Sequence, residues 1–266
     1  MDEPRLTTEL LLAHTLNMKR ISLYLNFDRP LSEEELSSFR NLIKRRLNNE
    51  PVQYITEKTE FMGYEIETPT GVFIPRQETE ILVYIVKNWI DREKLTNFIL
   101  YDIGTGTGAI AIFFAAQYSQ AKIYASDISR DAVVCAKRNI ERNKLSGRIV
   151  VLTGNLLYPF KDTEKADVII SNPPYIPTSE LNDLPEIVKK EPREALDGGE
   201  KGLNFIERII KEAREFLKPN GLLAIEMGIN QSKAVRNIFE RSKAYKSLQT
   251  FSDLRGIKRV HTGVRL

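Results

Sequence analysis

The chain has 266 residues, 42% of them hydrophobic, and carries 39 basic against 36 acidic side chains for a net charge of +3. This length favours two domains, or one domain with an appendage, and the near balance of charge argues against sequence-specific binding to nucleic acid. One cysteine excludes an internal disulfide, and with only His14 and His261 beside it we expect no metal cluster of soft ligands.

The single cysteine, Cys135, lies on the apolar side of a helical pattern with Ala132, Ala136 and Ile140. A buried thiol is therefore expected there, and not a nucleophile. The amino terminus lacks a basic region followed by an apolar block, so no signal peptide is expected. The longest apolar run, residues 109–116, is too short to cross a bilayer. We predict a cytoplasmic protein that does not bind membranes.

The first fifth of the chain, residues 6 to about 50, is predicted to be helical. Ser32 to Glu35 has the spacing of a capping box, and Leu36, Phe39, Ile43 and Leu47 then recur on one helix face. From Gln53 to Ile74 the character changes. Aromatic and β-branched runs, the first of them at residues 53–55, are broken at Gly63 and at residues 69–71, which predicts a hairpin linking two domains.

Strand and helix patterns alternate through the rest of the chain, beginning with a helix that holds Ile81, Leu82, Ile85 and Trp89. The predicted strands are residues 98–103, 122–128, 149–152, 166–171, 222–227, 247–252 and 259–266. The predicted helices between them are residues 108–118, 130–144, 202–217 and 230–241. This alternation predicts an α/β fold with a parallel sheet covered on both faces, and the last strands are close enough for an antiparallel hairpin at its edge.

A glycine-rich segment follows the first of these strands and opens a helix. It runs through Asp102, Ile103, Gly104, Thr105, Gly106, Thr107 and Gly108. Glycines there allow a sharp turn and a close approach to a ligand beside the positive end of a helix. The segment also fits the dinucleotide pattern G-x-G-x-x-G/A when Ala109 is included, so its ligand stays open at this point.

Polar residues follow the next two strands as well. Asp127 ends the second strand, where a carboxylate can accept both ribose hydroxyls of a nucleoside, although it can also cap the following helix beside Ser129. Asn155 and Leu156 follow the third strand, where an amide can meet an adenine edge and an apolar side chain can pack on the ring.

The most informative segment is Asn172-Pro173-Pro174-Tyr175, directly after the strand at residues 166–171. Two prolines stiffen the exit from the strand. They leave an amide side chain, carbonyls without competing donors and an aromatic face in one small space, which suits a planar substrate that carries an NH₂ group. A proline-rich turn with no further role is the alternative.

All four features lie at carboxyl ends of strands, the edge at which open α/β sheets bind ligands. A nicotinamide enzyme needs an acid or base for hydride chemistry, and neither histidine falls in these loops. S-Adenosyl-L-methionine carries its own activated methyl group, so its enzyme mainly has to align a nucleophile. We therefore interpret the cofactor as S-adenosyl-L-methionine, with S-adenosyl-L-homocysteine as product.

At these residues the chain resembles the HemK/PrmC family of release factor glutamine methyltransferases. The matching segments run in the family's order over nearly the whole chain: residues 51–55, 73–76 with Thr79 and Glu80, 102–108, 172–175, and 191–196 with Gly198 and Gly199. The tetrapeptide at 172–175 is shared with amino methyltransferases of DNA bases, whereas the set together is specific. The pattern departs from the family at Gln77, where proline is usual, and at Asn155, where aspartate is common.

The resemblance implies a helical bundle at residues 1–56 that binds the release factor, a β-hairpin linker at 57–77, and a Rossmann-like class I methyltransferase domain at 78–266. That domain would hold a seven-stranded mixed sheet with an antiparallel edge hairpin. The implied reaction methylates the side-chain nitrogen (N5) of the Gln in the Gly-Gly-Gln motif of class I peptide chain release factors. We expect a monomer whose partner is that protein substrate.

The expected catalytic residues are Asn172, Pro173 and Tyr175, and Pro174 and Phe73 are expected to complete the substrate site. The Asn172 side-chain oxygen and the Pro173 carbonyl would accept hydrogen bonds from the two N–H groups of the substrate amide. Besides the residues above, Ile128 and Asn172 are expected to contact the cofactor. Amino methylation of a nucleic-acid base, oxidoreduction with NAD and a non-catalytic binding module remain the alternatives.

Overall fold

The computed structural model describes residues 4–266. Its helices are α1 (Pro4–Thr15), α2 (Arg20–Leu25), α3 (Glu33–Leu47), α4 (Val52–Thr56), α5 (Gln77–Arg92), α6 (Ala109–Gln117), α7 (Arg130–Arg142), α8 (Asn204–Phe216) and α9 (Ser232–Ser242). Its strands are β1 (Lys58–Phe61), β2 (Tyr64–Glu67), β3 (Ile99–Ile103), β4 (Lys122–Asp127), β5 (Ile149–Thr153), β6 (Ala166–Ser171), β7 (Leu217–Glu226), β8 (Tyr245–Ser252) and β9 (Lys258–Arg265).

The larger sheet has seven strands in the order β5-β4-β3-β6-β7-β9-β8. The first five strands in this order are parallel, whereas β9 is antiparallel to both β7 and β8. The predicted mixed sheet with an antiparallel edge hairpin is confirmed. The chain runs outward from β3 to β5 and then returns to β6 on the other side of β3, so the strand order reverses between β3 and β6.

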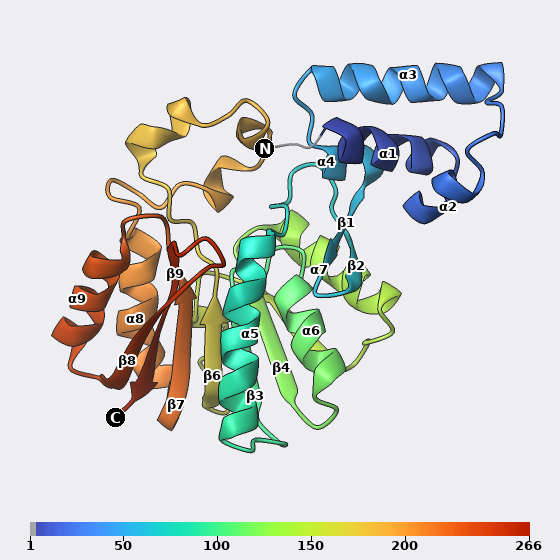
Figure 1. The fold of residues 1–266 in the computed structure, drawn as a ribbon. Coiled ribbons are helices and arrows are strands. Elements are labelled where there is room, and N and C mark those ends of the chain that lie inside the picture. The colour runs from blue at the N-terminus through green and yellow to red at the C-terminus, as the bar shows by residue number, and fades with distance from the viewer. Residues whose placement is uncertain (1–3) are drawn as a thin grey trace.

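Helices cover both faces of this sheet (Figure 1). The hairpin, α5, α6 and α7 pack on one face through a core that includes Leu82, Ile112 and Ile170. On the other face α8 and α9 pack against Tyr101 and Ile225. Alternate residues of a strand point to opposite faces, and here both sets are apolar, as a sheet buried on both faces requires.

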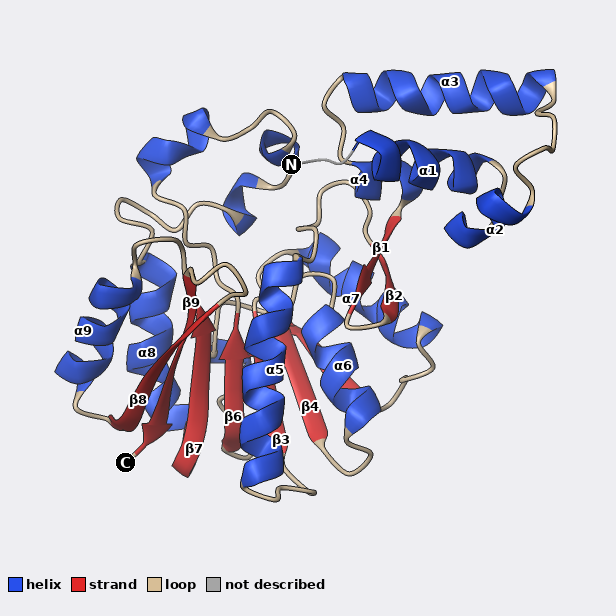
Figure 2. Cartoon of the chain, in the orientation of Figure 1, coloured by secondary structure: helices blue, strands red, loops and turns tan. Residues whose placement is uncertain are grey.

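The amino-terminal helices form a small separate core in which Leu11 of α1 packs with Val52 and Ile55 of α4, and α3 contributes partly buried side chains. The predicted capping box is present, because Ser32 accepts from the Glu35 N–H and Glu35 accepts from the Ser32 N–H. These helices lie above the sheet at the end where its parallel strands terminate (Figure 2).

Two details of the sequence prediction are wrong. Residues 53–55 form part of helix α4 and no strand, because Pro51 begins a helical turn whose apolar side chains pack onto Leu11. Leu47 does not lie on a buried helix face and is 76% exposed, since it occupies the last position of α3. The hairpin itself is confirmed as β1 and β2, joined by a tight turn in which Met62 and Gly63 both have positive φ.

The thiol of Cys135 is buried as predicted, and burial raises its pKa to about 12, which makes it a poor nucleophile. His261 is fully buried on β9, where its Nδ1 lies 2.8 Å from the Thr250 hydroxyl. No helix among residues 4–266 has the length and apolar character needed to cross a membrane.

Candidate active site

A cavity of about 730 Å³ opens along the carboxyl edge of the sheet, centred where the strand order reverses between β3 and β6. Its volume is in the range usual for small-molecule sites, and a reversal point is the usual ligand position in an open α/β sheet. The predicted site residues that line it are Phe73, Gly104, Thr105, Gly106, Thr107, Asp127, Ile128, Asn155, Leu156, Asn172, Pro173, Pro174 and Tyr175.

The structure places Asp102 and Gly108 outside this lining. Asp102 is fully buried, its Oδ2 accepts a 2.6 Å bond from the Thr105 hydroxyl, and burial raises its pKa to about 7. A side chain at Gly108 would come within 3.1 Å of the Ala136 Cβ, so this glycine allows α6 and α7 to pack closely. Both residues therefore support the glycine-rich loop without lining the cavity.

The glycine loop turns through residues with positive φ, 71° at Gly104 and 56° at Gly106. Its N–H groups at Gly104 and Thr105 both donate to the Ser126 carbonyl of β4, each at 2.9 Å. On the other side of the loop, Asn139 of α7 donates to the Thr107 carbonyl at 3.0 Å. These bonds hold the loop backbone in place along the cavity.

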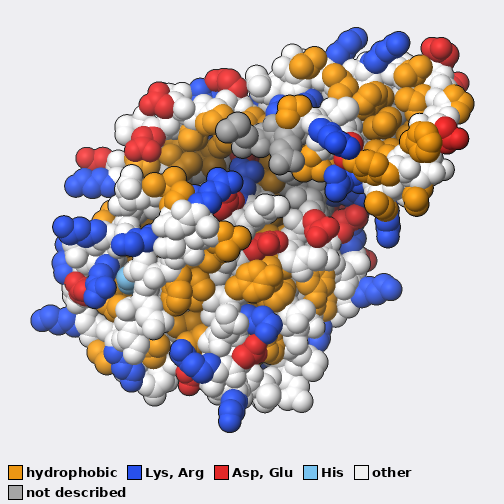
Figure 3. Space-filling view, viewed as in Figure 1, with side chains coloured by type: hydrophobic (Ala, Val, Ile, Leu, Met, Phe, Trp, Pro, Cys, Tyr) orange, Lys and Arg blue, Asp and Glu red, His pale blue; other side chains and the backbone are white. Residues whose placement is uncertain are grey.

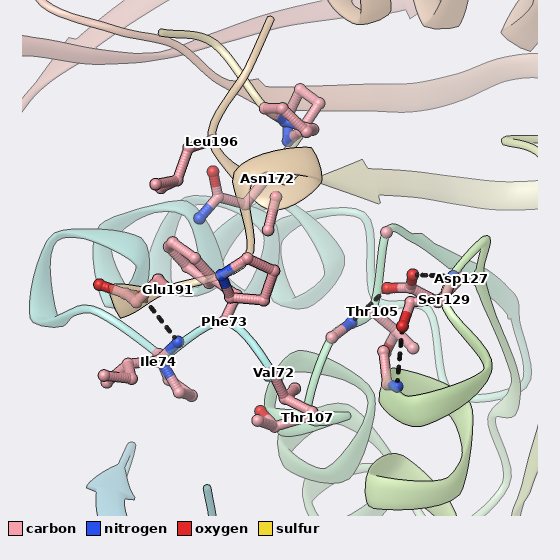
Figure 4. Close-up of a pocket in the computed structure, with 18 of the residues that line it drawn as sticks. Val72, Phe73, Ile74, Thr105, Thr107, Asp127, Ser129, Asn172, Glu191 and Leu196 are labelled. Atoms are coloured by element: carbon pink, nitrogen blue, oxygen red, sulfur yellow. Dashed lines mark hydrogen bonds between the residues drawn. The ribbon is translucent and has the colours of Figure 1, made fainter. Parts of the chain in front are cut away.

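Asp127 lies directly beside the glycine loop at the cavity wall (Figure 4). Its carboxylate accepts from the Gly106 N–H at 2.8 Å and from the Ser129 N–H at 2.9 Å. Burial raises its pKa, and these backbone donors oppose the rise. The Ser129 side chain caps α7, so Asp127 bridges the loop and the helix start while its carboxylate remains at the cavity wall.

Asn155 and Leu156 follow β5 on the far side of the cavity. The Asn155 side-chain oxygen accepts a long, 3.4 Å bond from Arg208 of α8. Leu156 has a φ of 50° and its carbonyl accepts from the Ser126 hydroxyl at 3.0 Å, which fixes the turn.

The segment after β6 places two acceptors at the cavity. The Asn172 side-chain Nδ2 donates to the Thr79 Oγ1 at 2.9 Å, which leaves its Oδ1 free of hydrogen bonds to residues 4–266. Within the same residues no hydrogen bond engages the Pro173 carbonyl. The Tyr175 ring lines the cavity while its hydroxyl donates to Glu226 at 3.2 Å, and burial raises its pKa.

Phe73 lies on a strap, residues 72–76, that crosses the cavity next to Asn172 (Figure 4). Glu191 holds this strap: its buried carboxylate accepts from the Ile74 N–H at 3.1 Å and pairs with the Arg76 guanidinium. Burial raises the pKa of Glu191, and the positive charge of Arg76 opposes that rise. The strap is thereby fastened to the long loop that follows β6.

Sequence reasoning assigned no role to Thr79, Glu191, Glu226 or Arg259, all of which line the cavity. Thr79 and Glu191 belong to the segments that carry the family resemblance, so the sequence singled out these two positions without indicating what their side chains do. For Glu226 the available signal was a lone acidic residue at the end of the apolar strand at residues 222–227. No group of three or more potential metal ligands occurs within residues 4–266.

Comparison with known proteins identifies the family. The model of the PrmC N-terminal domain matches residues 1–56, and that of the methyltransferase small domain matches residues 64–200. The release factor glutamine methyltransferase of Geobacter sulfurreducens is 41% identical over 264 residues, covering 99% of this chain and 90% of that protein. The chain belongs to the release factor glutamine methyltransferase family. The family member from Moorella thermoacetica is 36% identical and covers 100% of this chain and 93% of its own length.

Solved structures agree with this fold. The human METTL16 catalytic domain in complex with an RNA hairpin superposes with a TM-score of 0.63 at 20% identity, covering 89% of this chain and 92% of that one. A methyltransferase from Pyrococcus furiosus gives a TM-score of 0.54 at 21% identity, covering 84% and 98% of the two chains. At such identity the likeness supports the fold alone. The predicted family and Rossmann-like methyltransferase fold are confirmed, and membership of the family implies S-adenosyl-L-methionine as methyl donor.

Proposed function

We propose that this protein methylates the side-chain amide nitrogen (N5) of the Gln in the Gly-Gly-Gln motif of class I peptide chain release factors. The observation that carries the proposal is the pair of unused acceptors, Asn172 Oδ1 and the Pro173 carbonyl, at a cavity lined by the glycine loop. A primary amide presents two N–H donors, and the relatives that match the whole chain are named for this substrate.

The cavity suits S-adenosyl-L-methionine in size and in chemistry. Gly104 to Thr107 allow a close approach of the ligand to the backbone, Asp127 offers carboxylate oxygens for the ribose hydroxyls, and Asn155 with Leu156 would meet the adenine. The side chain of Ile128, which is exposed and lines the cavity, would cover the adenine from the other side. When bound, the cofactor supplies a methyl group on a positively charged sulfur, and S-adenosyl-L-homocysteine remains after transfer.

The chain's own residues have to make an unreactive nitrogen reactive. An amide nitrogen is a weak nucleophile because its lone pair is delocalised into the carbonyl. Asn172 Oδ1 and the Pro173 carbonyl would accept hydrogen bonds from its two N–H groups. These bonds would fix the orientation of the nitrogen and stabilise the positive charge that grows on it. Pro174 and the Tyr175 ring would bound the amide on one side and Phe73 on the other. No strong base is needed, since the nitrogen carries a positive charge directly after methyl transfer and is then acidic enough to release one of its two protons to water.

We assign the amino-terminal helices, residues 1–56, to binding of the release factor, residues 57–77 to the link, and residues 78–266 to methyl transfer. Apolar side chains gather over the amino-terminal helices (Figure 3). On α2 the side chains of Ile21 and Leu25 are 64% and 76% exposed, and just after this helix Phe27 is 86% exposed. Exposed apolar clusters of this kind mark protein-binding surfaces. We further expect a cytoplasmic monomer that needs no metal.

A methyl transfer assay tests the proposal. Purified protein is incubated with methyl-labelled S-adenosyl-L-methionine and either a release factor or the same factor with its motif Gln replaced by Ala. We expect label in the first and none in the second. The tetrapeptide at residues 172–175 is shared with amino methyltransferases of DNA bases, which makes a nucleic-acid base the second candidate, so DNA and RNA are added in parallel. Label in nucleic acid, or equal label in both release factors, would overturn the proposal.

A further inference from the structure

A loop that has no part in the mechanism above, residues 196–202, packs against the chain that leaves the proposed amide site. It holds Gly198 and Gly199, which belong to the segments that carry the family resemblance. The Gly198 N–H donates to the Ile176 carbonyl at 2.8 Å, and the Ile176 N–H donates to the Leu196 carbonyl at 3.0 Å. These bonds fasten the chain just beyond the amide site.

Gln231 reaches the same chain from the strand next to β6. It follows β7, directly precedes α9 and does not line the cavity. Its side-chain Nε2 donates to the Tyr175 carbonyl at 2.8 Å and to the Gly202 carbonyl at 3.3 Å. Its Oε1 accepts from the Gly228 N–H at 2.8 Å. Because a backbone N–H can only donate and a carbonyl can only accept, the Gln231 amide fits in one orientation alone.

Three glycines allow this close approach. A side chain at Gly198 would come within 2.8 Å of the Tyr175 Cα. Gly202 has a φ of 67°, and a side chain there would overlap the Tyr175 carbonyl. A side chain at Gly228 would come within 3.2 Å of the Tyr175 ring. The backbone of Tyr175 is therefore closely surrounded, and Gln231 supplies the donor that its carbonyl needs there.

Tyr175 is thereby held at both ends by the end of β7 and the residues that follow it. Its hydroxyl donates to Glu226, the last residue of β7, at 3.2 Å, and its carbonyl accepts from Gln231. The ring of Pro174 fixes its own φ, so the backbone between the Pro173 carbonyl and Tyr175 has little freedom. A shift of the Tyr175 backbone would therefore turn the Pro173 carbonyl as well.

We propose that Gln231 is a positioning residue for methyl transfer. By holding the Tyr175 carbonyl, it keeps the Pro173 carbonyl directed at the substrate amide and the Tyr175 ring beside it. The carbonyls of Tyr175 and Ile176 are engaged, whereas that of Pro173 has no hydrogen-bond partner within residues 4–266. The inference rests on the proposed function, in which the Pro173 carbonyl accepts from the amide nitrogen. Without Gln231, the Tyr175 carbonyl would turn toward another donor and displace the Pro173 acceptor.

Gln231→Glu and Gln231→Met form a matched pair, because both keep about the length of the side chain and at about pH 8 neither can donate to the Tyr175 carbonyl. The first keeps an acceptor for the Gly228 N–H and adds a negative charge, whereas the second is neutral. We expect kcat to fall about tenfold or more in both, since a displaced acceptor at the reacting atom is costly. The Kd for S-adenosyl-L-methionine, measured by calorimetry, should stay within about twofold and so show that the site is folded.

Gln249→Glu is the control for charge, because Gln249 lies exposed on β8, and its kcat should stay within about twofold of the unaltered protein. An equal fall in Gln249→Glu, a normal kcat in either Gln231 variant, or a Kd that rises as much as kcat falls would overturn the proposal. If Asn172→Ala keeps normal turnover, the proposed function fails. If Asn172→Ala is inactive and the Gln231 variants are normal, this inference alone fails.

Discussion

Asn139 offers a sharp test of how the hairpin linker is joined to the glycine loop. This fully buried side chain of α7 accepts from the Glu67 N–H at 2.6 Å and donates to the Glu67 carbonyl and the Thr107 carbonyl, each at 3.0 Å. One amide therefore fastens both the end of β2 and the loop that lines the cavity. We predict that Asn139→Ala weakens the fold and the cofactor site together.

The expected loss follows from the groups left behind. The Glu67 carbonyl keeps a weak donor in the Cys135 thiol at 3.4 Å, but the Glu67 N–H and the Thr107 carbonyl lose their partner. Each buried polar group left unpaired costs about 1–3 kcal/mol, so Asn139→Ala should lower the free energy of unfolding by about 3 kcal/mol. The free energy of unfolding decreases by about 3 kcal/mol for each molar of urea, so the urea concentration at the unfolding midpoint should fall by about 1 M.

Urea unfolding followed by circular dichroism measures this change, and Asn143→Ala supplies the control. Asn143 is the C-cap of α7, and its side-chain amide donates to the Glu65 carbonyl at 3.2 Å, at an exposed position, and to the Asn139 carbonyl at 2.9 Å. Neither bond joins the hairpin to the glycine loop. The loss of these bonds should cost less than about 1 kcal/mol. Asn139→Ala should in addition raise the KM for S-adenosyl-L-methionine. Equal losses in the two variants, or a loss below about 1 kcal/mol for Asn139→Ala, would refute the reasoning.

Three further predictions concern single side chains. Asn172→Ala should lower kcat about a hundredfold with little change in the Kd of S-adenosyl-L-methionine, because it removes an acceptor aligned with developing charge; near-normal turnover in the release factor assay would contradict this. Asp127→Ala should raise the KM for the cofactor far more than it lowers kcat, and an unchanged KM would remove Asp127 from the ribose. Burial lowers the pKa of His261 from 6.5 to about 4. Between these pH values the unfolded chain binds the proton more readily than the folded one, so the free energy of unfolding decreases as the pH is lowered. From pH 7 to pH 5 His261 should cost about 2 kcal/mol, seen as a smaller acid loss in urea titrations of His261→Gln. Equal acid losses in both proteins would show that His261 is not responsible.

Much of the fold could be predicted from the sequence because its signals are local. Apolar strands followed by amphipathic helices of ordinary length require a parallel sheet covered on both faces, and this sheet is present. The glycine loop needs positive φ at Gly104 and Gly106, a demand that glycine alone meets without strain. The errors fall where local preference is weak: at residues 53–55, β-branched and aromatic composition favoured a strand and packing onto Leu11 decided for a helix.

The sequence by itself determined that polar residues follow four strands of one sheet, and on that basis predicted a nucleoside site along that edge with an amide acceptor at Asn172. The tertiary structure alone decided what holds these residues. Thr79 and Asn172 are 93 residues apart, and Glu226 is 51 from Tyr175, so no local pattern links them. Hydrogen bonds between such distant residues depend on strand order and on the packing of α5 across the sheet, and both follow from the burial of the whole core.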